Sequence, residues 1–155
     1  MKESEFKFYG SLLNQRTIFD HPTGLFVLFF TEMWERFSYY GMRAILVLFL
    51  TSSLLNDGWE WEREDALVLY GWYTGLAYFT PIIGGIIADK LLGYRNATVI
   101  GAIIMAIGHG SMALEYFDDF FFFIGIGLII IGNGLFKPNI SSMVGQLYRE
   151  SDIRK

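Results

Sequence analysis

Two carboxylates and two arginines follow one another at helical spacing near the start of the chain. Residues 32–43 read EMWERFSYYGMR. In a helix that turns by about 100° per residue, the charged and phenolic side chains of this run fall within about 140° of one another. We call this set the polar stripe; it consists of Glu32, Glu35, Arg36, Tyr39, Tyr40 and Arg43.

The polar stripe contains groups that exchange protons and groups that hold anions. Carboxylates take up and release protons, and the planar fork of arginine grips a carboxylate with two parallel hydrogen bonds. A ligand carboxylate that draws an arginine away from a neighbouring glutamate makes that glutamate hold its proton more tightly. The stripe therefore predicts a water-lined cavity in which proton uptake is coupled to the binding of an anionic ligand.

A second polar group lies beside a proline in residues 132–142, GNGLFKPNISS. Pro138 has no amide hydrogen, so the carbonyl of Gly134 loses its usual helical partner, and we expect a kink or local unwinding. Broken helices are tolerated at membrane depth where they line a cavity, which would place Lys137 and Asn139 at a site. Alternatively, Lys137 reaches along the helix to the cytoplasmic interface.

Other polar side chains give weaker signals. Tyr70, Tyr73 and Tyr78 could supply hydrogen bonds and an apolar wall to a cavity, although helix packing accounts for most such tyrosines. His109 could titrate near neutral pH, but a lone histidine among glycine and serine is more often a hydrogen-bonded packing residue.

The elements that position these residues are four apolar stretches, over residues 25–50, 66–88, 97–117 and 120–148. A helix needs about 20 apolar residues to cross a bilayer. A chain of 155 residues has too little other material to cover four such helices. The sequence thus predicts an all-α membrane protein with four transmembrane helices within residues 21–148, an N-terminal cytoplasmic segment (1–20) and a cytoplasmic tail (149–155).

Charges inside these stretches cost roughly 2.5–3.5 kcal/mol each at the bilayer centre on insertion scales, unless they pair or face water. Glu32 and Arg36 have the spacing of an i,i+4 ion pair, and Glu35 could pair with a neighbouring helix. The residues alone therefore leave two interpretations open: a set of structural ion pairs, or a functional cavity.

Composition excludes several other classes of protein. The chain is 53% hydrophobic and only 18% charged, and it has no cysteine. Its net charge of −4 argues against a nucleic-acid partner. The sequence shows no metal-ligand cluster, no phosphate-binding loop and no nucleophile with a base at recognisable spacing, so we expect neither an enzyme nor a metal or other cofactor.

The distribution of basic residues predicts the orientation in the membrane. One side has eight of them, and the other has only Arg63, beside several acids. We therefore expect a multi-pass protein of the cell membrane with both termini in the cytoplasm. The eight are Lys2, Lys7, Arg16, Lys90, Arg95, Arg149, Arg154 and Lys155.

Three motifs in order resemble the proton-dependent oligopeptide transporter family, a branch of the major facilitator superfamily. Residues 32–40 match the family's ExxERFxYY signature throughout. Residues 81–95, PIIGGIIADKLLGYR, are similar to the superfamily's loop motif between helices two and three, and residues 134–141, GLFKPNIS, to the family's fourth helix.

The resemblance implies four helices of a six-helix N-terminal bundle in a symporter that imports di- and tripeptides with protons by alternating access. It assigns proton coupling to Glu32 and Glu35, and gating to Gly85, Asp89, Lys90 and Arg95. The implied peptide-binding residues are Arg36, Tyr39, Tyr40, Arg43, Tyr78, Lys137 and Asn139. Gly71 stands where animal members have a histidine implicated in proton handling.

A complete member has at least twelve spans, whereas this chain stops before a fifth. We therefore expect part of a transporter, not competent alone, whose partners are short peptides, protons, the lipid bilayer and the remaining helices. Two alternatives remain: a proton-coupled symporter of another small solute such as nitrate, and a non-transporting remnant that assembles with partner helices.

Overall fold

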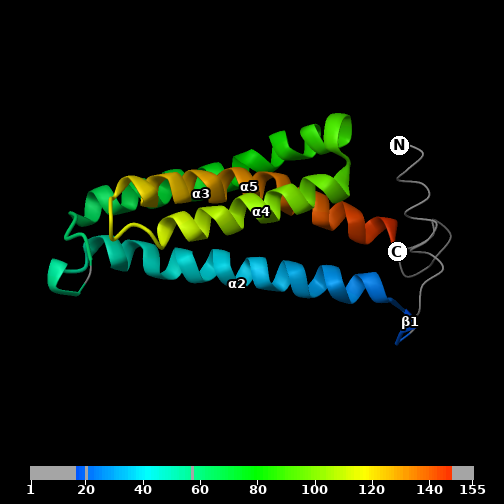
Figure 1. Ribbon diagram of the computed structural model, residues 1–155, viewed down its shortest axis with the longest axis horizontal. Coiled ribbons are helices and arrows are strands. Elements are labelled where there is room, and N and C mark those ends of the chain that lie inside the picture. The colour runs from blue at the N-terminus through cyan, green and yellow to red at the C-terminus, as the bar shows by residue number, and fades with distance from the viewer. Residues whose placement is uncertain (1–16, 20, 57, 148–155) are drawn as a thin grey trace.

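The computed structural model describes residues 17–19, 21–56 and 58–147, and its main elements are four long helices (Figure 1). These are α2 (Thr23–Thr51), α3 (Arg63–Ile87), α4 (Tyr94–Met112) and α5 (Phe120–Gln146). The 3-10 turn η1 (Leu54–Asn56) follows α2, and the π-helical segment η2 (Ala88–Leu92) continues α3. The predicted all-α class is confirmed, apart from a two-residue antiparallel ladder of β1 (Thr17–Ile18) and β2 (His21–Pro22).

Most of the predicted cytoplasmic segment 1–20 and the whole tail 149–155 lie outside the described residues, as do six of the eight basic residues used for the orientation.

Local chemistry sets the helix ends. Asp118 accepts a hydrogen bond from the Phe120 amide at 2.8 Å and so satisfies one of the free donors at the start of α5. Gly93 has φ 76°, a left-handed value that favours glycine, and separates η2 from α4. Glu64 and Asp65 in the first turn of α3 complement the positive end of its dipole.

The third helix differs from its predicted range. α4 begins at Tyr94 and ends at Met112, followed by turns over residues 113–117, whereas the sequence suggested helix over 97–117. The Ala113 amide still bonds to the His109 carbonyl, but the next amide, that of Leu114, bonds to Ser111 only three residues back. This tightening ends the α-helix.

α5 lies at the centre of the bundle, where glycines allow close helix contact. A Cβ on Gly84 of α3 would overlap the backbone of Gly134 of α5. A Cβ on Gly101 of α4 would lie 2.7 Å from the carbonyl oxygen of Gly132. Thr80 Oγ1 of α3 also donates to the Ile130 carbonyl of α5 at 3.1 Å. α3, α4 and α5 therefore form one tightly packed group, with α2 alongside it (Figure 1).

Aromatic side chains close the end of the bundle where α2 leads into α3. Trp59 contacts Phe49 of α2 and Phe122 of α5 in tilted arrangements, with ring centroids 5.7 and 4.7 Å away. The Trp61 amide bonds to the Leu50 carbonyl at 2.8 Å, which folds the connecting segment back onto α2. This end fixes how α2 lies against the other helices.

Two segments of the described chain are long and apolar enough to cross a membrane, Arg63–Leu92 and Phe120–Gln146. α2 has sufficient length, but each of its 18-residue stretches contains at least three of its four charges, those of Glu32, Glu35, Arg36 and Arg43. The charges that make α2 chemically informative thus also lower its hydropathy.

The sequence predicted a kink or local unwinding at Pro138, and the prediction of unwinding was wrong, because the helix continues through this residue. α5 continues as an α-helix from Phe120 to Gln146. A proline removes a single hydrogen bond, and the side chains of Phe136 and Ile140, which are buried on either side of it, hold the helix in place. The irregular backbone occurs instead at η2, which contains Asp89 and Lys90.

Candidate functional site

The polar stripe begins with an ion pair on the surface of α2. Arg36 donates to Glu32 Oε1 from Nε at 3.1 Å and from Nη2 at 2.5 Å, across one helical turn. The Arg36 side chain is 48% exposed and that of Glu32 28% exposed. The predicted i,i+4 pair is therefore present, and both of its members remain accessible to a ligand or to further helices.

Further along α2, Arg43 connects to α3. It donates to the Tyr70 hydroxyl from Nε at 3.0 Å and from Nη2 at 2.7 Å. Its guanidinium carbon also lies 5.5 Å from the ring centroids of both Tyr39 and Tyr70. Aromatic faces attract cations, so the two rings hold the guanidinium in place. Tyr70 is thus the partner of Arg43, a role that the sequence did not indicate.

Lys137 approaches the same tyrosine from α5. Its Nζ lies 5.6 Å from the ring centroid of Tyr39 on α2 and 5.0 Å from that of Tyr78 on α3. The ammonium group is therefore directed toward the neighbouring helices. Neither Lys137 nor Arg43 forms an ion pair with a described residue.

Tyr39 is consequently near two cations that come from different helices. Its side chain is buried, with 7% exposed, whereas the adjacent Tyr40 is 52% exposed. Asn139, two residues after Lys137 in α5, is also buried and donates to the Leu135 carbonyl at 2.6 Å. An anionic group placed near Tyr39 could meet two positive charges, the arrangement that binds a carboxylate.

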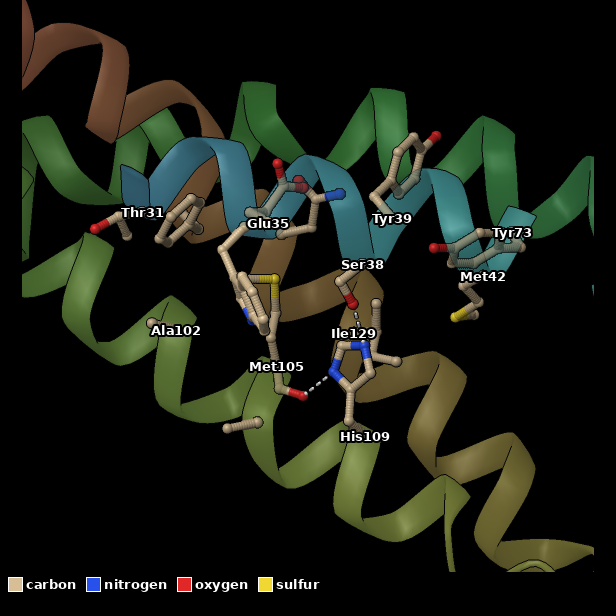
Figure 2. Close-up of a pocket in the computed structure, with 14 residues that line it drawn as sticks. Thr31, Glu35, Ser38, Tyr39, Met42, Tyr73, Ala102, Met105, His109 and Ile129 are labelled. Carbon is tan, nitrogen blue, oxygen red and sulfur yellow. Dashed lines mark hydrogen bonds between the residues drawn. The ribbon is translucent and has the colours of Figure 1, made fainter. Parts of the chain in front are cut away.

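Glu35 lines a cavity of about 460 Å³ between α2 and the other helices, and it also interacts electrostatically with Lys137. α2 contributes Thr31, Trp34, Glu35, Ser38, Tyr39 and Met42 to its lining. Figure 2 shows Ser38 directed from α2 toward His109 of α4. Ser38 Oγ and His109 Nε2 are 2.7 Å apart, and His109 Nδ1 is 2.8 Å from the Met105 carbonyl oxygen.

The structure brings several of the predicted site residues together at two places, both of which include Tyr39. Arg43, Lys137, Tyr39 and Tyr78 are brought together by contacts around the Tyr39 ring. Glu35 opens into the cavity, and Tyr39 also lines it. Sequence reasoning missed Trp34, Ser38 and Asn133 as lining residues.

The residues expected to gate lie at the other end of α3. Gly85 is in the last turn of α3, Asp89 and Lys90 are exposed in η2, and Arg95 is exposed at the start of α4. The short turn at Gly93 keeps them at one end of the bundle, opposite the connections α2–α3 and α4–α5 (Figure 1). They are separate from the cluster around Tyr39.

Comparison with known proteins identifies close relatives. A family model described as "POT family" matches residues 95–155. The chain is 46% identical over 141 residues to "Uncharacterized transporter YclF" of Bacillus subtilis (strain 168). It is 43% identical over 143 residues to a di-/tripeptide transporter of Lactococcus lactis subsp. cremoris.

The coverage of these matches is unequal. Each alignment takes in 91% of this chain but only 28% and 29% of the two relatives. A crystal structure of peptide transporter POT in complex with sulfate matches 96% of this chain and 30% of its own, at 41% identity and a TM-score of 0.89. The chain therefore spans less than a third of the length of the relatives it matches.

Proposed function

The chain belongs to the POT family, and we propose that it forms the N-terminal part of a proton-coupled symporter that imports di- and tripeptides. Its relative from Lactococcus lactis is named a di-/tripeptide transporter, which supports this substrate class. Because the chain covers less than a third of such relatives, the peptide site and the transport cycle would be completed by helices outside it.

The observation that carries the proposal is the pair of cations around Tyr39. Arg43 and Lys137 both lie near the Tyr39 ring, and neither forms an ion pair with a described carboxylate, although Lys137 is close enough to Glu35 to interact with it electrostatically. Two such charges in a low-dielectric site are costly unless an anion joins them. The carboxylate of a short peptide would supply that anion, with Tyr40, Tyr78 and Asn139 lining the site.

Proton coupling is assigned to Glu32 and Glu35. Glu32 already binds Arg36, so a peptide carboxylate that competes for Arg36 would free Glu32 to take up a proton. Glu35 lines the cavity and is therefore placed to exchange protons with water. The two carboxylates would thus respond to different events, one to the ligand and the other to hydration of the cavity.

The proposal extends to the membrane arrangement. The four helices would be the first four spans of a major facilitator N-terminal bundle in the cell membrane, with the N-terminus in the cytoplasm. α2 would be covered by water and by further helices along its polar stripe. Gly85, Asp89, Lys90 and Arg95 would then lie at the cytoplasmic end and act in gating. We propose neither enzymatic activity nor a cofactor.

The test is uptake of a labelled dipeptide by the complete transporter in liposomes with an inward proton gradient. Accumulation that unlabelled di- and tripeptides inhibit, and that nitrate and free amino acids do not, is the expected result. Inhibition by nitrate instead would support a symporter of another solute. Absence of any uptake or exchange would favour a non-transporting assembly. The 155-residue chain alone should give no uptake.

A further inference from the structure

In its neutral form, His109 has one hydrogen-bonding arrangement that fits its contacts, and it leaves Nε2 able to accept a proton. A backbone carbonyl only accepts hydrogen bonds, so the 2.8 Å contact with the Met105 carbonyl places the ring proton on Nδ1. Nε2 then carries a lone pair and accepts the Ser38 hydroxyl at 2.7 Å. The basic nitrogen of His109 is therefore turned toward α2, away from its own helix.

The cavity connects this nitrogen with Glu35. Glu35, Ser38 and His109 all line it, and Glu35 and Ser38 are three residues apart on one face of α2. A water molecule in the liquid occupies about 30 Å³, so about 460 Å³ leaves room for several. Water in the cavity would join the Glu35 carboxylate to the Ser38 hydroxyl, which already contacts Nε2.

Two buried polar atoms that line the cavity lack hydrogen-bond partners among the described residues, which indicates that water is present there. The hydroxyl of Tyr73 and the Oδ1 of Asn133 are buried, and neither makes a hydrogen bond with a described residue. Both side chains are 1% exposed and line the cavity. Buried polar atoms nearly always have partners, and ordered water is the usual one where protein groups are lacking.

Few groups around His109 can exchange protons with it near neutral pH. Among the described residues that line the cavity, α2 contributes Glu35 and Tyr39, α3 contributes Tyr73, and α5 contributes no titratable group. Phenols ionise near pH 10, well above the range of carboxyl and imidazole groups. Among the described residues that line the cavity, Glu35 is thus the one that can donate a proton to His109 near neutral pH.

We propose that His109 is a second proton-carrying residue of the transporter, linked to Glu35 through Ser38 and water. In this step, the Ser38 hydroxyl gives its proton to Nε2 and takes one from a water molecule, and that water takes the proton of the Glu35 carboxyl. A neutral acid and a neutral imidazole become a carboxylate and an imidazolium, so total charge is unchanged. The inference rests on the proposed function, because it assigns a role within proton-coupled transport.

The experiment uses the complete transporter in liposomes and compares two modes of dipeptide movement. Uptake driven by a proton gradient requires net proton transfer, whereas exchange of labelled for unlabelled dipeptide does not. His109→Gln should lower the gradient-driven rate at least about tenfold and leave exchange within about twofold. The gradient-driven rate of His109→Gln should also vary less with pH than that of wild type between about pH 5 and 8. Ser38→Ala, which keeps the imidazole and removes the relay, should give a smaller loss.

His21→Gln is the matched control, since it makes the same substitution outside the cavity, and it should behave as wild type. A His109→Gln protein whose gradient-driven rate and pH profile equal those of wild type would overturn the proposal. If the wild-type protein neither accumulates nor exchanges dipeptide, the proposed function fails, and the following titration still decides the proton step.

Nitrogen NMR of the ¹⁵N-histidine-labelled wild-type protein measures protonation of His109 directly. Because this measurement uses the wild-type protein, it remains possible even if His109→Gln fails to fold. Nε2 should change from unprotonated to protonated as the pH falls from about 8 to 5. Glu35→Gln should move the midpoint of this change by at least about half a pH unit. A His109 signal that is constant over this range would contradict the proposal. A midpoint that is the same in Glu35→Gln and wild type would also contradict it.

Discussion

Arg43 of α2 donates two hydrogen bonds to the Tyr70 hydroxyl of α3, at 3.0 and 2.7 Å. A guanidinium has five N–H donors, so three remain for a ligand while Tyr70 holds the group in position. The pair explains how an arginine on the loosely packed helix can have a fixed orientation toward Tyr39.

Arg43→Lys should therefore weaken peptide binding by about 1.5–3 kcal/mol, because it keeps the charge and removes the planar fork. Tyr70→Phe keeps the ring and removes the acceptor, so its effect should be smaller, about 0.5–1.5 kcal/mol. Binding of a labelled dipeptide to the purified complete transporter measures both. Equal affinity of Arg43→Lys and wild type would reject a carboxylate clamp at this position.

Lys137 should recognise the carboxylate end of the ligand. Wild type is expected to bind a dipeptide more tightly than its C-terminal amide, by about 1.5–3 kcal/mol for a charge-assisted contact. Lys137→Gln should reduce this preference. Tyr78→Phe is the control, since the ring face that the ammonium contacts is retained. A Lys137→Gln protein with the full preference for the free acid would show that the ammonium does not meet the carboxylate.

The helical spacing of residues 32–43 was sufficient to predict which side chains share a face of α2, but not which partners they meet. Glu32 and Arg36 pair within one helix, so local geometry alone predicts them. Arg43 with Tyr70, and Ser38 with His109, are separated by 27 and 71 residues in the sequence. Those contacts depend on how α2 packs against α3 and α4, which residue types and local spacing do not determine.

The prediction at Pro138 illustrates the opposite error, in which a local rule was given too much weight. Proline removes an amide donor wherever it occurs. In α5, however, Phe136 and Ile140 are 2% and 1% exposed, and their packing against neighbouring helices keeps the backbone helical. Tertiary packing therefore overrides the local preference at this residue.

The close contact of α3 with α5 gives a stability prediction. A Cβ at Gly84 would overlap the Gly134 carbonyl, so Gly84→Ala should force the helices apart and destabilise the protein by about 1–3 kcal/mol. A Cβ built at Gly71, also in α3, meets no atom of the described residues within 4 Å beyond its chain neighbours and the nearby backbone of its own helix. Gly71→Ala should therefore stay within about 0.5 kcal/mol of wild type.

Thermal stability of the purified complete transporter, followed by size-exclusion chromatography in detergent, compares the two alanine variants. If Gly84→Ala is as stable as Gly71→Ala, the helices are not in contact at Gly84 and the arrangement around α5 needs revision.

The central claim is that carboxylates of the polar stripe couple proton movement to peptide transport. It is tested most directly by the gradient-driven and exchange rates of dipeptide in liposomes that contain the complete transporter with Glu35→Gln. We predict that gradient-driven accumulation falls by about 100-fold or more while exchange persists. A glutamine keeps the size and hydrogen bonds of the side chain but cannot take up and release a proton. Glu32→Gln should also impair accumulation. Full accumulation by Glu35→Gln and Glu32→Gln, alone and together, would contradict the account.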